Sequence, residues 1–278
     1  MRIKLFFARI IYSFFRILLK KDVFIIKRKG ISYSINLSEG IDLALFLFGR
    51  FQPYISNSRY YTLPEDAVVF DIGANIGAMT LKFAQDVPKG HIYAFEAIPS
   101  VYTRLVQNIS LNPVLSGRIT PVNMLVSDST GEIDIPQTMC ASWNVCGQNQ
   151  NRHPVHGGIR QSVQIEDAVS IDDFCRKNTI QRVDLIKIDT DGTELSVLKG
   201  ALRTISKNTP VIIFEVSLSV LHEEHLLFDA YDAFFSLLDY RLINLKTGRM
   251  ITMDNFYREI PFSYTTDVLA IPRRKDFN

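Results

Sequence analysis

Hydrophobic and polar residues follow one another along this chain in a pattern that predicts strands and helices in turn. Short apolar runs, each long enough for one strand, cover residues 68–70, 91–95, 119–126, 183–188 and 211–214. Segments with apolar residues every three or four positions lie between them and predict helices over 78–85, 101–112, 170–177 and 195–202. This order of elements predicts an α/β fold, a mostly parallel sheet with helices on both faces.

The two ends of the chain depart from this alternation. Residues 23–37 alternate with a period of two around a turn, which predicts a hairpin, and residues 41–48 predict a short helix. Near the C-terminus, a helix at 231–240 and a strand at 241–245 are followed by a last strand at 267–271, which is expected to pair antiparallel.

Three parts are therefore expected. Residues 1–22 form a basic amphipathic helix, residues 23–64 a leader that caps the main domain, and residues 65–278 the catalytic domain. With 278 residues, 47% of them hydrophobic, the chain has material for one sizeable α/β domain plus appendages.

The clearest chemical signal lies in residues 68–96, where a strand, a glycine-bearing turn, a helix and a second strand follow one another. Asp71 ends the first strand and Glu96 the second. We expect Gly73 to let a bound molecule approach the backbone and Gly77 to let the helix start close to the sheet. Glu96 is placed to accept hydrogen bonds from two ribose hydroxyls.

The spacing of this turn favours S-adenosylmethionine over a dinucleotide. A dinucleotide fingerprint has the pattern G-x-G-x-x-G, whereas Asp71, Gly73 and Gly77 form D-x-G-x-x-x-G. A carboxylate at this position would repel a phosphate and attract the ammonium and sulfonium charges of S-adenosylmethionine. A turn in which the glycines are only structural would not explain acids at two successive strand ends.

Further acids follow the strands at 183–188 and 211–214. Since the carboxyl ends of parallel strands meet at one edge of a sheet, Asp189 and Glu215 are expected beside Asp71 and Glu96. An alcohol that is to be methylated must lose its proton, and four residues are candidate general bases for that step: Asp189, Asp191, Glu215 and His222.

Among these, Asp189 is the first choice, because it follows a strongly apolar strand where desolvation would favour proton uptake. Helix capping could explain either Asp189 or Asp191, but it explains both poorly. A magnesium ion held by these two and Glu215 is an alternative that the number of acids alone does not favour.

Four motifs together carry a family resemblance: FDIGANIGAMT at 70–80, AFEAIPS at 94–100, VSDSTGEI at 126–133 and DLIKIDTDGTELSVLKGA at 184–201. In this order and at these separations they resemble the FkbM-type methyltransferases, over about residues 41–271. The resemblance implies the Rossmann-like class I methyltransferase fold and transfer of a methyl group from S-adenosylmethionine, mostly to hydroxyls of sugars and secondary metabolites.

Position by position, the resemblance also implies cofactor contacts. Glu96 would hold the ribose and Asp128 would lie beside the adenine, and the methionine part would be lined by Asp71, Gly73, Asn75 and Gly77. Two departures stand out, since the family usually has a glutamate where this chain has Asp191, and a glutamate-proline pair where it has Glu96 and Ala97. Asp191 is expected to face the acceptor, so the shorter carboxylate there points to a substrate that differs from those of relatives with the glutamate.

The composition of the chain argues against some classes of binding partner. A net charge of +2 lacks the clustered basic excess of a nucleic-acid-binding protein. Three cysteines are an odd and sparse set, which indicates reduced thiols and a cytoplasmic location.

A zinc site is disfavoured, because the candidate ligands have the spacing C-x5-C-x6-H-x2-H: Cys140, Cys146, His153 and His156. These residues belong to a polar, irregular segment at 137–161 that also holds Trp143 and is our candidate for recognition of a small-molecule or glycan acceptor.

Residues 1–21 contain six basic residues and no acid. Arg2, Arg9 and Arg16 are seven apart, so a helix would carry a basic stripe on an apolar cylinder, as in helices that lie on an anionic membrane surface. The arginines interrupt the apolar run too early for a spanning helix or a secretory signal. The alternative is that this helix packs on the domain or on a second subunit.

Two other functions remain open from sequence alone. A nicotinamide-dependent oxidoreductase would need room for a pyrophosphate at the glycine turn and a second domain. A non-enzymatic membrane-associated protein would have no use for Asp71, Glu96 and Asp189 together.

Overall fold

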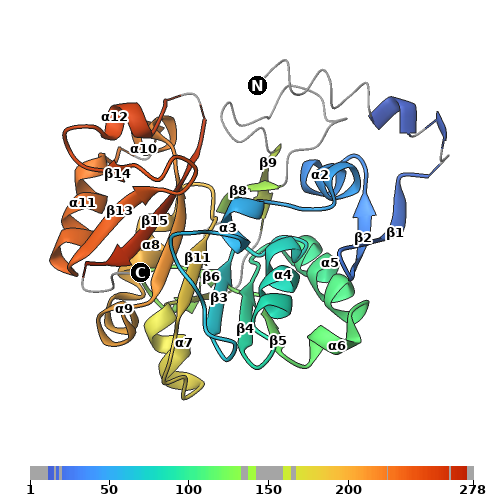
Figure 1. The fold of residues 1–278 in the computed structure, drawn as a ribbon, viewed down its shortest axis with the longest axis horizontal. Coiled ribbons are helices and arrows are strands. Elements are labelled where there is room, and N and C mark those ends of the chain that lie inside the picture. The colour runs from blue at the N-terminus through green and yellow to red at the C-terminus, as the bar shows by residue number, and fades with distance from the viewer. Residues whose placement is uncertain are drawn as a thin grey trace.

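The protein is described from a computed structural model that covers residues 12–15, 17–18, 21–132, 137–141, 159–163, 167–223, 225–262 and 264–273. At its centre is a sheet of eight strands with helices on both faces (Figure 1). In chain order these strands are β3 (Val68–Ile72), β4 (His91–Phe95), β5 (Ile119–Val122), β11 (Leu185–Ile188), β12 (Val211–Val216), β13 (Tyr240–Asn244), β14 (Met250–Ile251) and β15 (Thr266–Pro272).

The spatial order of the main sheet is β14-β13-β15-β12-β11-β3-β4-β5. The five strands from β12 to β5 run parallel. The last strand, β15, pairs antiparallel with both β12 and β13, as predicted. The edge strand β14, which the sequence did not predict, is also antiparallel. The predicted α/β fold with a mostly parallel sheet is thus confirmed.

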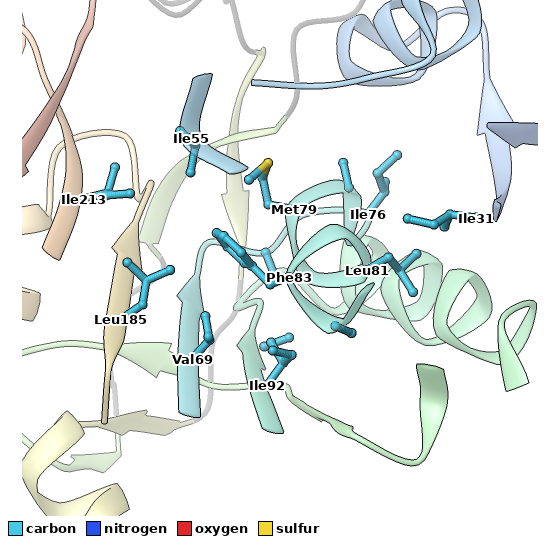
Figure 2. Packing of buried hydrophobic residues seen from close by; sticks show 14 of the residues in the cluster. Ile31, Ile55, Val69, Ile76, Met79, Leu81, Phe83, Ile92, Leu185 and Ile213 are labelled. Atoms are coloured by element: carbon cyan, nitrogen blue, oxygen red, sulfur yellow. The ribbon is translucent and has the colours of Figure 1, made fainter. Parts of the chain in front are cut away.

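Each central strand faces two hydrophobic clusters, because successive side chains point to opposite faces. Val69 and Leu185 face a cluster with α4 (Ala78–Asp86) and α5 (Pro99–Ser110). The close view in Figure 2 shows Val69 and Leu185 beside Phe83 of α4. The next residue of each strand, Phe70 and Ile186, faces the second cluster.

The helices of the second cluster come from the C-terminal half of the chain: α7 (Ile171–Lys177), α8 (Glu194–Lys199), α9 (Leu202–Asn208), α10 (Leu218–Glu223), α11 (Phe228–Leu237) and α12 (Phe256–Glu259). Ser170 caps α7 as its sequence suggests, because its hydroxyl accepts the Asp173 amide at 3.2 Å. A short helix, α6 (Pro113–Ser116), connects α5 to β5.

The leader consists of a hairpin, β1 (Val23–Arg28) with β2 (Ile31–Asn36), and two helices, α2 (Gly40–Phe48) and α3 (Pro53–Ser56). The hairpin and α2 confirm the sequence prediction. The free edge of β2 is covered by α5 and the residues just after it, where the side chains of Asn108 on α5 and Asn112 before α6 accept the Ser34 and Ser32 amides at 2.7 and 2.8 Å. These bonds satisfy an edge that would otherwise expose its backbone.

Two predictions about strands were wrong. The predicted strand at 119–126 is two strands in different sheets, because β5 ends at Val122 and β6 (Leu125–Val126) pairs with β10 (Asp167–Val169) next to β7 (Gly131–Glu132). The segment at 137–161, expected to be irregular, begins with β8 (Gln137–Ala141), which pairs with β9 (Ile159–Val163). Trp143, Cys146 and both histidines of this segment lie outside the described residues.

The predicted N-terminal helix is only partly within the description. Residues 12–15 and 17–18 are helical, and residues 1–11 lie outside the described part of the chain. In the part that is described, none of the helices combines the length and the apolar character needed to cross a bilayer.

Candidate functional site

The strand order reverses between β3 and β11, at the centre of the main sheet. From β3 the chain crosses through α4 to β4 on one side, and from β11 it crosses through α8 and α9 to β12 on the other. The turns after β3 and β11 therefore diverge, and open parallel sheets bind ligands at such a point. We call them the β3 turn (residues 73–77) and the β11 turn (residues 189–193).

Every backbone amide of the β3 turn donates a hydrogen bond inside the protein. The amides of Gly73 and Ala74 donate to the Phe95 carbonyl, at 3.0 and 2.9 Å. The remaining amides of the turn find acceptors on Glu96, on the Asn75 side chain and on the Ala74 carbonyl. A pyrophosphate needs such amides to be free. The turn is therefore poorly suited to a dinucleotide.

The two glycines of this turn have left-handed backbone angles and lie close to neighbouring chain segments. Gly73 has φ +76°, and a Cβ there would lie 1.9 Å from the Asp189 carbonyl oxygen. Gly77 has φ +86°, and its Cβ would lie 2.7 Å from a methyl group of Leu105 on α5. Gly73 thus leaves room for the β11 turn, and its expected contact with a bound ligand stays a prediction. Gly77 leaves room for α5, whereas from the sequence it was expected to let α4 start close to the sheet.

Glu96 organises the β3 turn from the end of β4. One carboxylate oxygen accepts the Asn75 amide at 2.9 Å and the other accepts the Ile98 amide at 2.9 Å. Burial raises the pKa of Glu96 to about 7. Each carboxylate oxygen has a further lone pair, so the residue can still accept two hydroxyl groups. This geometry fits the predicted contact with a ribose.

Asp71 lies inside β3 and is fully buried, although it was expected at the strand end. Its Oδ2 accepts the Thr80 hydroxyl at 2.6 Å, and its Oδ1 lies 3.4 Å from the ammonium of Lys187. The expected attraction of a sulfonium by Asp71 is therefore weakened, because a lysine within the sheet already balances this carboxylate.

Lys187 is one residue of this site that was not selected from the sequence. It lies in β11, 3% exposed, with its Nζ 3.1 Å from Asp189 Oδ2 as well as near Asp71. Burial would lower the pKa of Lys187, but Asp189 and Asp71 raise it above its usual value. A charged residue inside an otherwise apolar strand was the signal, since a buried lysine requires partners.

The β11 turn is held by a glutamate of its own. Glu194, the first residue of α8, accepts the amides of Thr190 and Gly192, each at 3.1 Å. Burial raises the pKa of Glu194 to about 7. Asp191 adopts φ 56° at the tip of the turn and is exposed. The turn thereby presents Asp189 and Asp191 toward the end of β12.

Three of the predicted catalytic residues come together here. One carboxylate oxygen from each of Asp189, Asp191 and Glu215 lies within 4.8 Å of the others. A hard cation such as Mg²⁺ would suit this oxygen set. Lys187 supplies positive charge to Asp189 directly, however. Magnesium remains an alternative that the arrangement permits without requiring.

Glu215 borders a second buried acid that the sequence analysis did not select. In the register of β12 with β15 it lies opposite Asp267. Burial, with Asp189 and Asp267 adding to it, raises the pKa of Glu215 well above its usual range. Asp267 Oδ2 accepts the hydroxyl of Tyr54 at 2.7 Å, and Lys246 Nζ lies 3.5 Å from the same oxygen. Tyr54 belongs to α3, so the leader forms part of this edge.

Asp128 and His222 lie farther out. Asp128 is exposed after β6, and its amide donates to the Ser196 hydroxyl at 3.1 Å. Its neighbours Ser127 and Ser129 line a surface hollow of about 290 Å³, which fits a place beside a ligand. His222 is exposed on α10, and its described contact is with the Phe262 ring. The contacts of the described residues do not connect His222 to the acids.

Comparison with known proteins relates this chain to a family. Residues 71–242, from Asp71 to β13, match the model of the methyltransferase FkbM domain. The chain belongs to the FkbM methyltransferase family. The predicted resemblance is confirmed, and with it the Rossmann-like class I fold and the assignment to S-adenosylmethionine-dependent methyltransferases.

Several named proteins are similar to this FkbM domain. The 2-O-methyltransferase NoeI of Sinorhizobium fredii is 30% identical over 171 residues, which cover 58% of this chain and 68% of NoeI. The hexuronic acid methyltransferase AglP of Haloferax volcanii is 28% identical over 149 residues, which cover 54% of this chain and 56% of AglP.

A crystal structure of methyltransferase FkbM from Methylobacillus flagellatus has a TM-score of 0.52 and 18% identity to this chain. The match covers 81% of this chain and 49% of the other. At this identity the likeness supports the fold alone. The chain thus spans about half of that structure.

Proposed function

We propose that this protein transfers the methyl group of S-adenosylmethionine to a hydroxyl of a sugar, a glycan precursor or a secondary metabolite. The observation that carries the proposal is the group of carboxylates Asp189, Asp191 and Glu215, within 4.8 Å of one another beside the turn that Glu96 organises. A hydroxyl acceptor needs a base at this place, and the names of NoeI and AglP, a 2-O-methyltransferase and a hexuronic acid methyltransferase, agree with such an acceptor.

S-adenosylmethionine, when bound, supplies an electrophilic methyl group whose carbon–sulfur bond breaks as the acceptor oxygen attacks. The chain has to hold the acceptor oxygen in line with that bond, which is where most of the acceleration can arise. Glu96 would fix the ribose end of the donor through its two oriented oxygens. The acids after β11 and in β12 would orient the acceptor hydroxyl.

Between the acids, we assign the general base to Glu215 ahead of Asp189, the first choice from sequence. The reason given for Asp189 was desolvation, yet its side chain is 25% exposed and bound to the Lys187 ammonium, which stabilises the carboxylate and occupies it. Glu215 has the raised pKa that a base for an alcohol needs. It would take the hydroxyl proton as the new carbon–oxygen bond forms.

The test is methyl transfer from labelled S-adenosylmethionine to a panel of hydroxylated acceptors, including hexuronic acids. We expect Glu215→Gln to lower kcat by about 100-fold or more, with the affinity for S-adenosylmethionine nearly unchanged. The wild-type kcat should rise with pH as Glu215 loses its proton. Asp229→Asn on α11, an exposed acid away from the sheet edge, is the matched control and should keep full activity.

Two results would contradict the proposal. A Glu215→Gln variant with normal kcat would remove Glu215 as the base and return Asp189 to that role. A folded protein that binds neither S-adenosylmethionine nor any acceptor would favour the non-enzymatic membrane-associated alternative.

A further inference from the structure

Positive charge is concentrated at the N-terminal end of this chain. Residues 1–30 contain nine basic residues and one acid, Asp22, whereas the whole chain has a net charge of only +2. The remainder of the chain is therefore acidic on balance. A molecule with such a separation of charge is attracted to an anionic surface by one end.

The outer face of β1 combines this charge with exposed apolar side chains. Val23 and Ile25, which alternate with more buried residues, are 56% and 61% exposed. Lys21 and Lys27 continue the same row at a period of two and are also exposed. A strand face that carries lysine, valine, isoleucine and lysine in turn is unusual for a surface that meets only water.

The helical residues before the hairpin expose a second apolar face. Phe14, Ile17 and Leu18 share one side of the helix and are 61%, 78% and 62% exposed. The adjacent Phe15 holds this helix in place, because its ring lies 4.8 Å from that of Phe46 on α2, which in turn contacts β1. Both apolar faces thus belong to one packed unit, at the edge of the molecule away from the main sheet (Figure 1).

Cationic side chains also gather where this unit meets the main domain. A small hollow of about 30 Å³ lies between the hairpin turn, the end of α2 and α4, and four basic residues are among those that line it: Arg28, Lys29, Arg50 and Lys82. Lys82 forms an ion pair with Asp86. Guanidinium and ammonium groups in such a group are suited to phosphate oxygens.

We propose that this N-terminal unit docks on a bilayer surface that contains anionic phospholipids. Val23, Ile25 and the apolar helix face would enter the boundary between headgroups and acyl chains, and the lysines would contact headgroup phosphates. A second copy of the chain fits less well, because a symmetric contact would place the same basic residues opposite one another. The charge of the unit therefore selects the anionic membrane as its partner.

The test is co-sedimentation of the full chain with vesicles of phosphatidylcholine, with and without phosphatidylglycerol. We expect binding only to vesicles with the anionic lipid, and weaker binding at high salt. The double variants Val23→Asp/Ile25→Asp and Lys21→Glu/Lys27→Glu should each reduce binding roughly tenfold or more. Val114→Asp, at an 86% exposed apolar position on α6, is the matched control and should bind normally.

Thermal unfolding checks that each variant is folded, and binding of S-adenosylmethionine should be unchanged in all of them, so this test is independent of the proposed activity. Equal binding to neutral vesicles, no binding, or normal binding by both double variants would overturn the proposal. A concentration-dependent dimer that Val23→Asp/Ile25→Asp abolishes would also overturn it and assign the face to a second copy.

Discussion

The β3 turn and the β11 turn lie on neighbouring strands, and each is shaped around one buried glutamate. Asn75 and Asp191 occupy equivalent left-handed positions, with φ 51° and 56°. Glu96 accepts the Asn75 amide in the first turn, and Glu194 accepts the Gly192 amide in the second. The pKa of each glutamate is raised to about 7 by burial.

The two turns differ in where their glutamate comes from. Glu96 follows the neighbouring strand β4, 21 residues after Asn75, whereas Glu194 lies two residues after Gly192. The β3 turn consequently has its shape only when β3 and β4 are paired in register, and the β11 turn can form it locally. In our proposal the β3 turn holds the methyl donor, S-adenosylmethionine, and the β11 turn faces the acceptor. The β11 turn forms locally, so it can accommodate a substitution such as Asp191 for the glutamate that is usual in the family.

Gly73→Ala would break the contact between the two turns. A Cβ would collide with the Asp189 carbonyl at 1.9 Å, and alanine at φ +76° is strained besides. We expect a loss of about 4 kcal/mol or more in the free energy of unfolding, or no folded protein at all. Urea denaturation measures this. Gly117→Ala is the control, because its Cβ would meet nothing within 4 Å, and a similar loss there would contradict the argument.

Lys187→Met would remove the cation that lies beneath both turns. Among the described side chains that contact Asp71, which is fully buried, only the Thr80 hydroxyl would then remain as a partner for its charge. We expect a loss of about 3 kcal/mol at neutral pH, measured by urea denaturation. The double variant Lys187→Met/Asp71→Asn should recover part of it, since the unpaired charge is gone. A double variant no more stable than Lys187→Met would show that lost packing is the cause.

Glu96→Ala and Glu194→Ala sharpen the division of roles between the turns. Removal of Glu96 should weaken binding of S-adenosylmethionine by about 2 kcal/mol, roughly 30-fold, because two hydrogen bonds to a charged group are lost. Removal of Glu194 should leave that affinity within about threefold and lower kcat/KM for the acceptor instead. Isothermal titration and initial rates separate the two. Equal effects on donor affinity would contradict the assignment of one turn to each substrate.

The pH dependence of stability compares the two glutamates directly. Since the folded-state pKa of each is raised from 4.5 to about 7, the folded protein holds these protons more tightly than the unfolded chain. Stability should therefore fall as pH rises from about 4.5 to 7 and level off above that range, by on the order of 1 kcal/mol per pH unit for each glutamate. Glu96→Gln and Glu194→Gln should each flatten this slope in urea titrations at several pH values. An unchanged slope would mean that the glutamate is ionised throughout.

Much of the fold followed from local patterns. The strand at 91–95 was predicted to the residue, and the helix at 78–85 differs from α4 by one residue. Strong apolar periodicity between glycine and proline breaks accounts for this. The strand at 119–126 failed for the opposite reason, since β5 and β6 join different sheets and the chain between them carries no strong break.

Some of the site could be predicted in the same way. Because the carboxyl ends of parallel strands share an edge, the sequence was enough to bring Asp189, Asp191 and Glu215 together. The residues that pair with the acids of the site could not be predicted from the sequence. Tyr54 lies 213 residues from Asp267 in the chain, and only the packing of α3 on the sheet edge brings the two side chains to 2.7 Å.

The amino-acid sequence by itself determined the alternation of strands and helices, the turn with its two glycines and the edge on which the acids lie, because these depend on residues near one another in the chain. The tertiary structure decided what those residues do. Gly73 makes room for a neighbouring turn, Asp71 is balanced by Lys187, and Glu96 accepts the Asn75 amide, since each of these contacts joins segments that belong to different strands of the sheet or to the turns that follow them. Burial and pairing between strands set the charges of the site, and neither can be seen until the strands are side by side.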